Sequence, residues 1–175
     1  MKKKLLSILL VLSLMLALVP TAFAADIVDS GTCGADGDGS SVTWTLDAAG
    51  LLTISGTGKI INGDGGSIWS GKPVMAVDIR SGITAVGSNA FYGCDQLQVI
   101  SLPDTVTQLD KNAFGNCAAL SSILVDAKNP AYKSVDGALY SKDGTVLIKC
   151  PADAETFVVP DGVTTIGDYA FFGAK

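Results

Sequence analysis

The residues of this chain best suited to chemistry are four cysteines, Cys33, Cys94, Cys117 and Cys150. Two of them recur in related surroundings, because residues 90–94 have the sequence AFYGC and residues 113–117 have AFGNC. A third related run, AFFGA at residues 170–174, has alanine in place of the cysteine. A thiol in such a run could be a nucleophile, a metal ligand, half of a disulfide or a core side chain.

Catalysis by these thiols is disfavoured because the chain contains no histidine. A cysteine nucleophile needs a neighbouring base, most often imidazole, and the same absence removes imidazole triads and most catalytic zinc sites. The chain has no C-x-x-C spacing, so zinc ribbons and thioredoxin-like motifs are unsupported. We therefore expect no enzymatic activity, no cofactor and no bound metal; a hydrolase built on paired aspartates is the alternative.

A side chain that recurs from repeat to repeat is better explained by packing than by catalysis. We predict that Cys94 and Cys117 are buried thiols at one repeated core position. A disulfide between them is an alternative, but side chains stacked about 4.8 Å apart exceed the Cβ separation of roughly 3.8 Å that a disulfide prefers. The sequence leaves open whether Cys33 and Cys150 are joined.

An acidic, glycine-rich run, DGDGS at residues 36–40, is a second candidate for chemistry. Alternating carboxylates suit a hard cation such as calcium. An EF-hand loop would need glycine at its sixth position and glutamate at its twelfth, where this chain has Ser41 and Asp47. We interpret the run as a turn before a strand, with a weak calcium site as the alternative.

Residues 1–24 have the features of an export signal. Lys2 to Lys4 form a basic start, an apolar run extends from Leu5 to about Val19, and Ala22 to Ala24 give a small-x-small cleavage pattern. We predict a signal peptide, a location that is secreted or at the cell surface, and no membrane span after cleavage; a retained anchor is the alternative.

Removal of this segment makes the chain strongly acidic. Three of the 12 basic residues lie before residue 25, so the mature chain carries nine bases against 17 acids, a net charge of −8. This charge argues against nucleic acid and anionic membrane surfaces as partners, since both need a basic patch.

Most of the remaining chain is a repeat of about 23 residues. Residues 77–97 align without a gap on residues 100–120, apolar position on apolar position. A third unit begins near residue 123 and is about ten residues longer, and a fourth begins near residue 157 and is incomplete. We expect a truncated chain, because an unfinished coil leaves apolar surface open.

Each repeat has the pattern of one strand and one return path. Residues 97–102 alternate between apolar and other side chains, which predicts a short strand that Pro103 ends. Ala113, Phe114 and Cys117 would then fill the convex side from an irregular or short helical turn. One such coil cannot bury its own apolar face, so the coils must stack with their strands parallel.

The motif L-x-x-I-x-L-P-x-x-V-x-x-L-x-x-x-A-F-x-x-C at residues 97–117 resembles the BspA-like leucine-rich repeat of bacterial surface and secreted proteins. The resemblance covers about residues 75–175, although Ala174 and the long third unit depart from the pattern. It implies a right-handed solenoid, no enzymatic activity and a binding role. The expected fold is a leucine-rich-repeat solenoid at residues 75–175 with an N-terminal β-hairpin cap region at residues 25–74.

The side chains that point out of the predicted sheet form a candidate ligand face, because concave solenoid faces commonly bind partners. Tyr132 and Tyr140 of the long third unit are candidate insertion-loop contacts, although packing would explain them equally well. We expect a protein or glycan ligand and a role in adhesion; the alternative is a non-binding structural module of a larger envelope protein. The candidate ligand face comprises Asp78, Arg80, Val99, Ser101, Leu124, Asp126 and Val158.

Overall fold

The computed structural model describes residues 26–64, 66–154 and 156–174. Strands and turns make up these ranges, which contain no helix. No helix in the described part of the chain is therefore long and apolar enough to cross a membrane. The predicted signal peptide lies outside the described residues.

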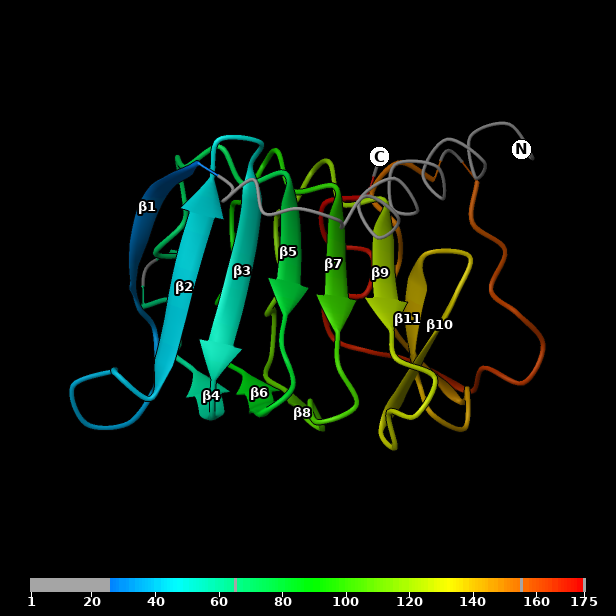
Figure 1. The fold of residues 1–175 in the computed structure, drawn as a ribbon. Helices are drawn as coiled ribbons and strands as arrows, with labels where there is room; N and C mark the ends of the chain where they lie inside the picture. The colour runs from blue at the N-terminus through cyan, green and yellow to red at the C-terminus, as the bar shows by residue number, and fades with distance from the viewer. Residues whose placement is uncertain (1–25, 65, 155, 175) are drawn as a thin grey trace, which may run out of the picture.

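A six-stranded sheet faces the viewer in Figure 1. Its first three strands are antiparallel and its last three continue in parallel, each residue lying beside its repeat equivalent, as Val77 lies beside Ile100 and Ile100 beside Ile123. The strands, in spatial order, are β1 (Ile27–Thr32), β2 (Val42–Asp47), β3 (Leu51–Gly56), β5 (Ala76–Ile79), β7 (Val99–Leu102) and β9 (Ser122–Val125).

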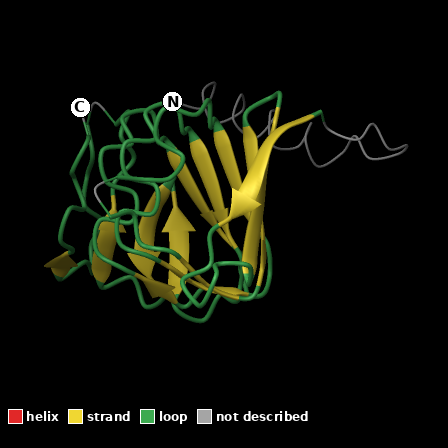
Figure 2. Cartoon of the chain, turned by 90° about the vertical axis from the view of Figure 1, so that its left-hand side faces the viewer, coloured by secondary structure: helices red, strands yellow, loops and turns green. Residues whose placement is uncertain are grey.

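Two smaller sheets complete the coils. The strands β4 (Gly58–Ile60), β6 (Ile83–Val86) and β8 (Gln108–Leu109) are parallel and lie at the bottom of Figure 1. The other sheet contains β10 (Tyr132–Val135), β11 (Ala138–Ser141), β12 (Val146–Lys149) and β13 (Thr165–Ile166). Seen along the stack in Figure 2, the six-stranded sheet forms one side of the molecule, while the opposite side has loops and turns above and short strands below.

The core repeats from coil to coil, as the sequence pattern predicts. Phe91 and Phe114 occupy one repeat position, and their ring centroids are 6.0 Å apart in a stacked arrangement. Trp69 continues the stack, with its centroid 4.9 Å from that of Phe91. The backbone is joined in the same way, since the Phe91 N–H donates to the Ala113 carbonyl at 2.9 Å. The predicted leucine-rich-repeat solenoid is confirmed, with turns and no helix on the convex side of its described coils.

The solenoid path begins earlier than the repeats recognised in the sequence. The β2–β3 hairpin is present, but β3 also pairs in parallel with β5, placing Leu52 beside Val77. The strand β4 follows β3 in this first coil and pairs with β6 of the next coil. Trp69, also in the first coil, takes the position of the repeated phenylalanine. The first coil therefore lies within residues 25–74, the segment assigned to the cap, and β1 is a further strand outside it.

The fourth unit does not join the six-stranded sheet, so the predicted place of Val158 in that sheet is wrong. The insertion hairpin β10–β11 occupies the edge beyond β9, where the Ile123 N–H donates to the Gly137 carbonyl at 3.0 Å. The Val125 N–H donates to the Ser134 hydroxyl at 3.4 Å. Because this edge is already covered, residues 156–160 form no strand, and Val158 is 85% exposed.

Candidate functional site

The outer face of the six-stranded sheet carries the side chains that alternate with the core. Asp78, Ser101 and Leu124 lie beside one another on β5, β7 and β9, and Val99 lies between Ala76 and Ser122. Their neighbours Val77, Ile100 and Ile123 are buried. The parallel pairing thus brings together four of the candidate face residues, namely Asp78, Val99, Ser101 and Leu124.

Arg80 and Asp126 follow the ends of β5 and β9. The Arg80 N–H donates to the Ile54 carbonyl, and the Asp126 N–H donates to the Leu102 carbonyl. Both residues therefore extend the backbone hydrogen bonding between coils. The Arg80 Nη2 atom lies 2.9 Å from the Asp78 Oδ2 atom. The Ser101 hydroxyl donates to the Asp78 Oδ1 atom at 2.9 Å. Asp78 therefore holds its neighbours in place, while most of the Arg80 side chain faces solvent.

The same face continues over the cap as a grid of hydroxyl groups that the sequence reasoning missed. On β2, Thr43 and Thr45 point outward on either side of the buried Trp44. Their neighbours across β1 and β3 are also serine or threonine. The alternation in residues 42–46 could have revealed part of the grid, but β1 was not predicted. The hydroxyl grid comprises Ser30, Thr32, Thr43, Thr45, Thr53 and Ser55.

Of the two insertion-loop tyrosines, Tyr140 is buried and Tyr132 is packed in part. Tyr140 is 3% exposed and belongs to a small core with Leu147 and Ala170. Tyr132 packs partly against the main core. Its hydroxyl accepts from the Leu109 N–H at 3.0 Å and donates to the Thr107 carbonyl at 3.3 Å, which satisfies the edge of β8.

All four cysteines are buried and none is joined in a disulfide. The protonated Cys117 thiol donates to the Phe91 carbonyl at 3.1 Å, which links successive coils. Burial raises the pKa of the Cys94 thiol to about 11 and that of Cys117 to about 12. Burial also raises the pKa of Cys33 to about 12 and shifts that of Cys150 in the same direction. The thiolate, which is the nucleophilic form, is therefore strongly disfavoured.

These pKa values predict that the free energy of unfolding falls as the pH rises above 9. The unfolded thiols ionise from an ordinary pKa of 9.0, whereas the folded thiols stay protonated to about 11 or 12. The unfolded state therefore binds fewer protons in this window, and each buried thiol removes roughly 1.4 kcal/mol per pH unit. Burial lowers the pKa of Lys149 from its ordinary value of 10.5, so this group makes the free energy of unfolding rise with pH below 10.5. It is one group acting against four thiols.

Urea unfolding from pH 7 to pH 10.5 measures this slope. The Cys94→Ala variant supplies a control, because Ala174 shows that alanine occurs at this repeat position. We expect this variant to have a shallower loss of stability above pH 9. A stability that is flat or rises through this window would contradict the burial of the thiols.

The acidic run at residues 36–40 forms a self-contained turn. The Asp38 Oδ1 atom accepts from the Ser40 N–H at 2.9 Å, and the Gly39 N–H donates to the Asp36 carbonyl at 3.0 Å. Within the described ranges, no three His, Cys, Asp or Glu side chains gather closely enough to hold a metal ion.

Successive coils contribute parallel strands to one sheet, three of them stack an aromatic ring at one repeated core position, and their outward side chains are aligned; these features define a leucine-rich-repeat solenoid. Residues 67–141 match the family described as "BspA type Leucine rich repeat region (6 copies)". Residues 67–141 are therefore BspA-type leucine-rich repeats. No curated protein matches the chain.

Three solved structures of bacterial proteins show a distant likeness. A leucine-rich repeat protein from Eubacterium ventriosum ATCC 27560 is 20% identical with a TM-score of 0.39, over 84% of this chain and 64% of that one. The pneumococcal vaccine antigen PcpA is 15% identical with a TM-score of 0.43, over 81% and 62%. A leucine rich cell surface protein from Faecalibacterium prausnitzii A2-165 is 17% identical with a TM-score of 0.31, over 81% and 74%. The chain spans less than two thirds of the first two structures.

Proposed function

We propose that this protein is exported and binds a protein or glycan ligand through the outer face of its six-stranded sheet, outside the cell or at its surface. The observation that carries the proposal is the alignment of outward side chains across six adjacent strands. One row passes from Ser30 and Thr45 on the cap to Thr53, Asp78, Ser101 and Leu124 on the coils. The predicted signal peptide and the BspA-type repeats support a location outside the cytoplasm.

The face is suited to binding because its side chains are held in place before a ligand arrives. Each inner strand is paired on both sides, and the Asp78 carboxylate fixes Arg80 and Ser101. Preorganised side chains lose less conformational entropy on binding. Beside the polar row lies a more apolar one, Leu51, Ala76 and Val99, so a ligand with both kinds of surface can be matched.

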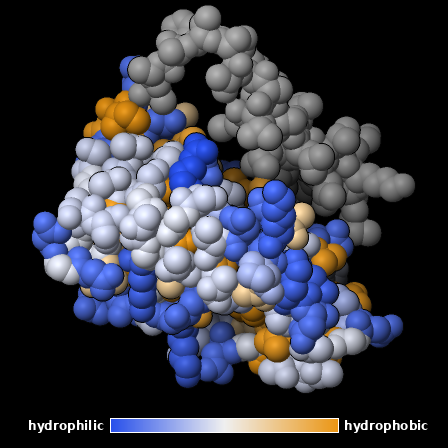
Figure 3. Space-filling view, turned by 60° about the horizontal axis from the view of Figure 1, so that its bottom comes forward, coloured by the Kyte–Doolittle hydropathy of each residue, from blue (hydrophilic) through white to orange (hydrophobic). Residues whose placement is uncertain are grey.

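The side of the molecule that carries the β4-β6-β8 sheet is a weaker candidate. Hydrophilic and neutral residues cover most of it, and hydrophobic residues gather only in small spots (Figure 3). A protein-binding surface usually has a larger apolar centre. The proposal also involves no catalysis, because the chain has no histidine and its thiols are buried.

The Arg80→Glu substitution tests the face directly. The mature chain, beginning at Ala25, is tested by surface plasmon resonance against purified extracellular matrix proteins and immobilised glycans. For a ligand that binds the wild type, reversing this exposed charge should weaken affinity about tenfold or more, as for a central interface arginine. Stability should change by only about 0.5 kcal/mol, since Arg80 lies at the surface.

Thr84→Glu provides the matched control, because Thr84 is exposed on β6, outside the six-stranded sheet. We expect it to bind like the wild type. Equal loss in both variants would indicate a general charge effect. No saturable ligand for the wild type would favour the competing interpretation, a structural module without a binding site on this chain.

A further inference from the structure

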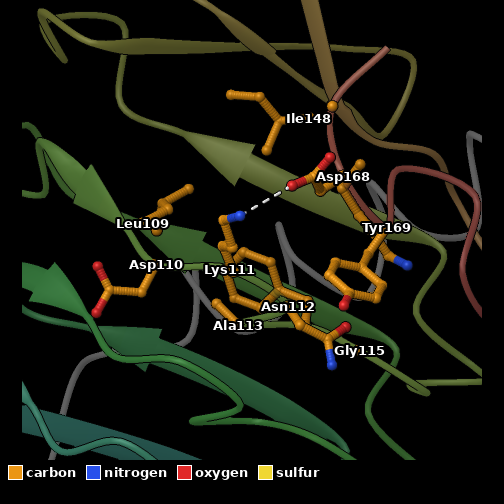
Figure 4. A pocket seen from close by; sticks show the side chains of 12 residues that line it. Leu109, Asp110, Lys111, Asn112, Ala113, Gly115, Ile148, Asp168 and Tyr169 are labelled. Carbon is orange, nitrogen blue, oxygen red and sulfur yellow. Dashed lines mark ion pairs between the residues drawn. The ribbon is translucent and has the colours of Figure 1, made fainter.

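A hollow of about 230 Å³ opens on the convex side, between the coil at residues 109–115 and the coil at residues 167–169. Figure 4 shows the side chains of both coils around it, with Ile148 on the coil between them. The hollow exists because the third unit has no Ala-Phe turn on this side. Its residues here are Leu147 to Pro151, which leave the space unfilled. Residues 147 and 166, which pair between β12 and β13, are only 19 residues apart.

One residue of the hollow departs from the repeat at an energetic cost. The position before the Ala-Phe pair has a left-handed backbone in three coils, with φ values of 55° at Asn89, 58° at Asn112 and 64° at Tyr169. Asparagine tolerates this conformation, whereas a bulky aromatic side chain is strained there. Strain of this kind often marks a functional position. Tyr169 lines the hollow and is 51% exposed.

Other aromatic rings extend the surface that Tyr169 begins. The Phe172 ring is 5.9 Å from the Tyr169 ring in an edge-to-face arrangement. The Tyr92 ring stacks on Phe172 at 6.5 Å. Phe172 is itself exposed, so these rings form a partly solvent-facing aromatic platform beside the hollow.

The charges that line the hollow balance one another. Lys111 and Asp168 form an ion pair of 3.2 Å, and both side chains are well exposed (Figure 4). Asp110 forms an ion pair with Lys59, and the Lys149 ammonium group donates a hydrogen bond to the Phe172 carbonyl. Two cations and two anions therefore line the site, which favours neither an anion nor a cation as its occupant.

We propose that this hollow binds one ring of a neutral sugar. The Tyr169 ring would pack against the apolar C–H face of the sugar, and the Lys111 and Asp168 side chains would bond its hydroxyl groups. The volume is below the roughly 300–1,000 Å³ of drug-sized sites, which suits a single ring. This site is separate from the outer sheet face and does not depend on the function proposed for that face.

Titration of the mature chain with methyl β-D-glucopyranoside and with N-acetylglucosamine, followed by saturation-transfer NMR, tests the proposal. We expect at least one sugar to bind the wild type with a dissociation constant on the order of 1 mM, as suits a small ligand. Tyr169→Asn should weaken binding at least about tenfold by removing the aromatic face. Its thermal midpoint should stay equal or rise, because asparagine restores the residue of the other coils.

Two further variants separate this site from general effects. Tyr169→Phe should retain most of the binding, since it keeps the ring, and Arg80→Glu should bind sugar like the wild type. The proposal is overturned if neither sugar binds the wild type, or if Tyr169→Asn binds as tightly. It is also overturned if inorganic phosphate binds in place of sugar, or if Tyr169→Asn lowers the thermal midpoint, which would show a structural role for the ring.

Discussion

Replacing Phe91 with alanine should lower the free energy of unfolding by about 3–5 kcal/mol, the range found for large buried aromatic side chains. Phe91 is 0% exposed and stacks between Trp69 and Phe114, with centroid separations of 4.9 Å and 6.0 Å. Its loss would leave a cavity that borders three successive coils. Urea unfolding monitored by tryptophan fluorescence measures the change in the free energy of unfolding, because Trp69 stacks directly on Phe91.

Phe171→Ala is the matched control for this prediction, since Phe171 occupies the same repeat position. Its side chain is 43% exposed, and among the described residues its ring contact is an edge-to-face one with Phe157 at 5.9 Å, not a stack like that of Trp69 on Phe91. We expect a loss of only about 1 kcal/mol, because much of the ring already contacts solvent. Equal losses in the two variants would mean that the aromatic stack is not what stabilises the coils.

The second large effect is expected at Asn129, whose replacement by alanine should cost about 3 kcal/mol or more. Its side chain is fully buried. The amide nitrogen donates to the Pro103 and Val106 carbonyls, both at 2.8 Å. The amide oxygen accepts from the Ala131 N–H at 2.9 Å and the Tyr132 N–H at 2.8 Å. Each bond contributes about 1 kcal/mol, and the partners left unpaired inside the protein add a further cost.

Asn129→Ala should also loosen the insertion, because Asn129 joins it to the preceding coil. Tyr132 would lose the bond that holds its backbone, and its hydroxyl would protect the Leu109 N–H less well. Hydrogen exchange at Leu109 should therefore accelerate by more than exchange at Ile79. Gln96→Ala, at an exposed position, should change neither quantity. Unchanged exchange at Leu109 would contradict this role of Asn129.

Where the 23-residue period holds, the sequence alone determined the local structure. The alternation in residues 97–102 predicts which side chains of β7 are buried, and Ile100 and Leu102 are both in the core. The recurrence of Cys94 and Cys117 predicts their burial in the same way. These predictions succeed because each coil contacts mainly its neighbours, so a repeated pattern implies a repeated environment.

Where the period breaks, only the tertiary structure decided the outcome. Residues 157–160 have the pattern of a repeat strand, yet β10–β11 already covers the edge of β9, and Val158 is left outside the sheet. Asn129 makes its key bonds with residues 23 and 26 positions earlier, and no local pattern specifies them. The hydroxyl grid needs the pairing of β1, and the hollow beside Tyr169 needs the coil at Ile148, which lacks the Ala-Phe turn. In each case the outcome depends on contacts between segments far apart in the sequence, which a local pattern does not specify.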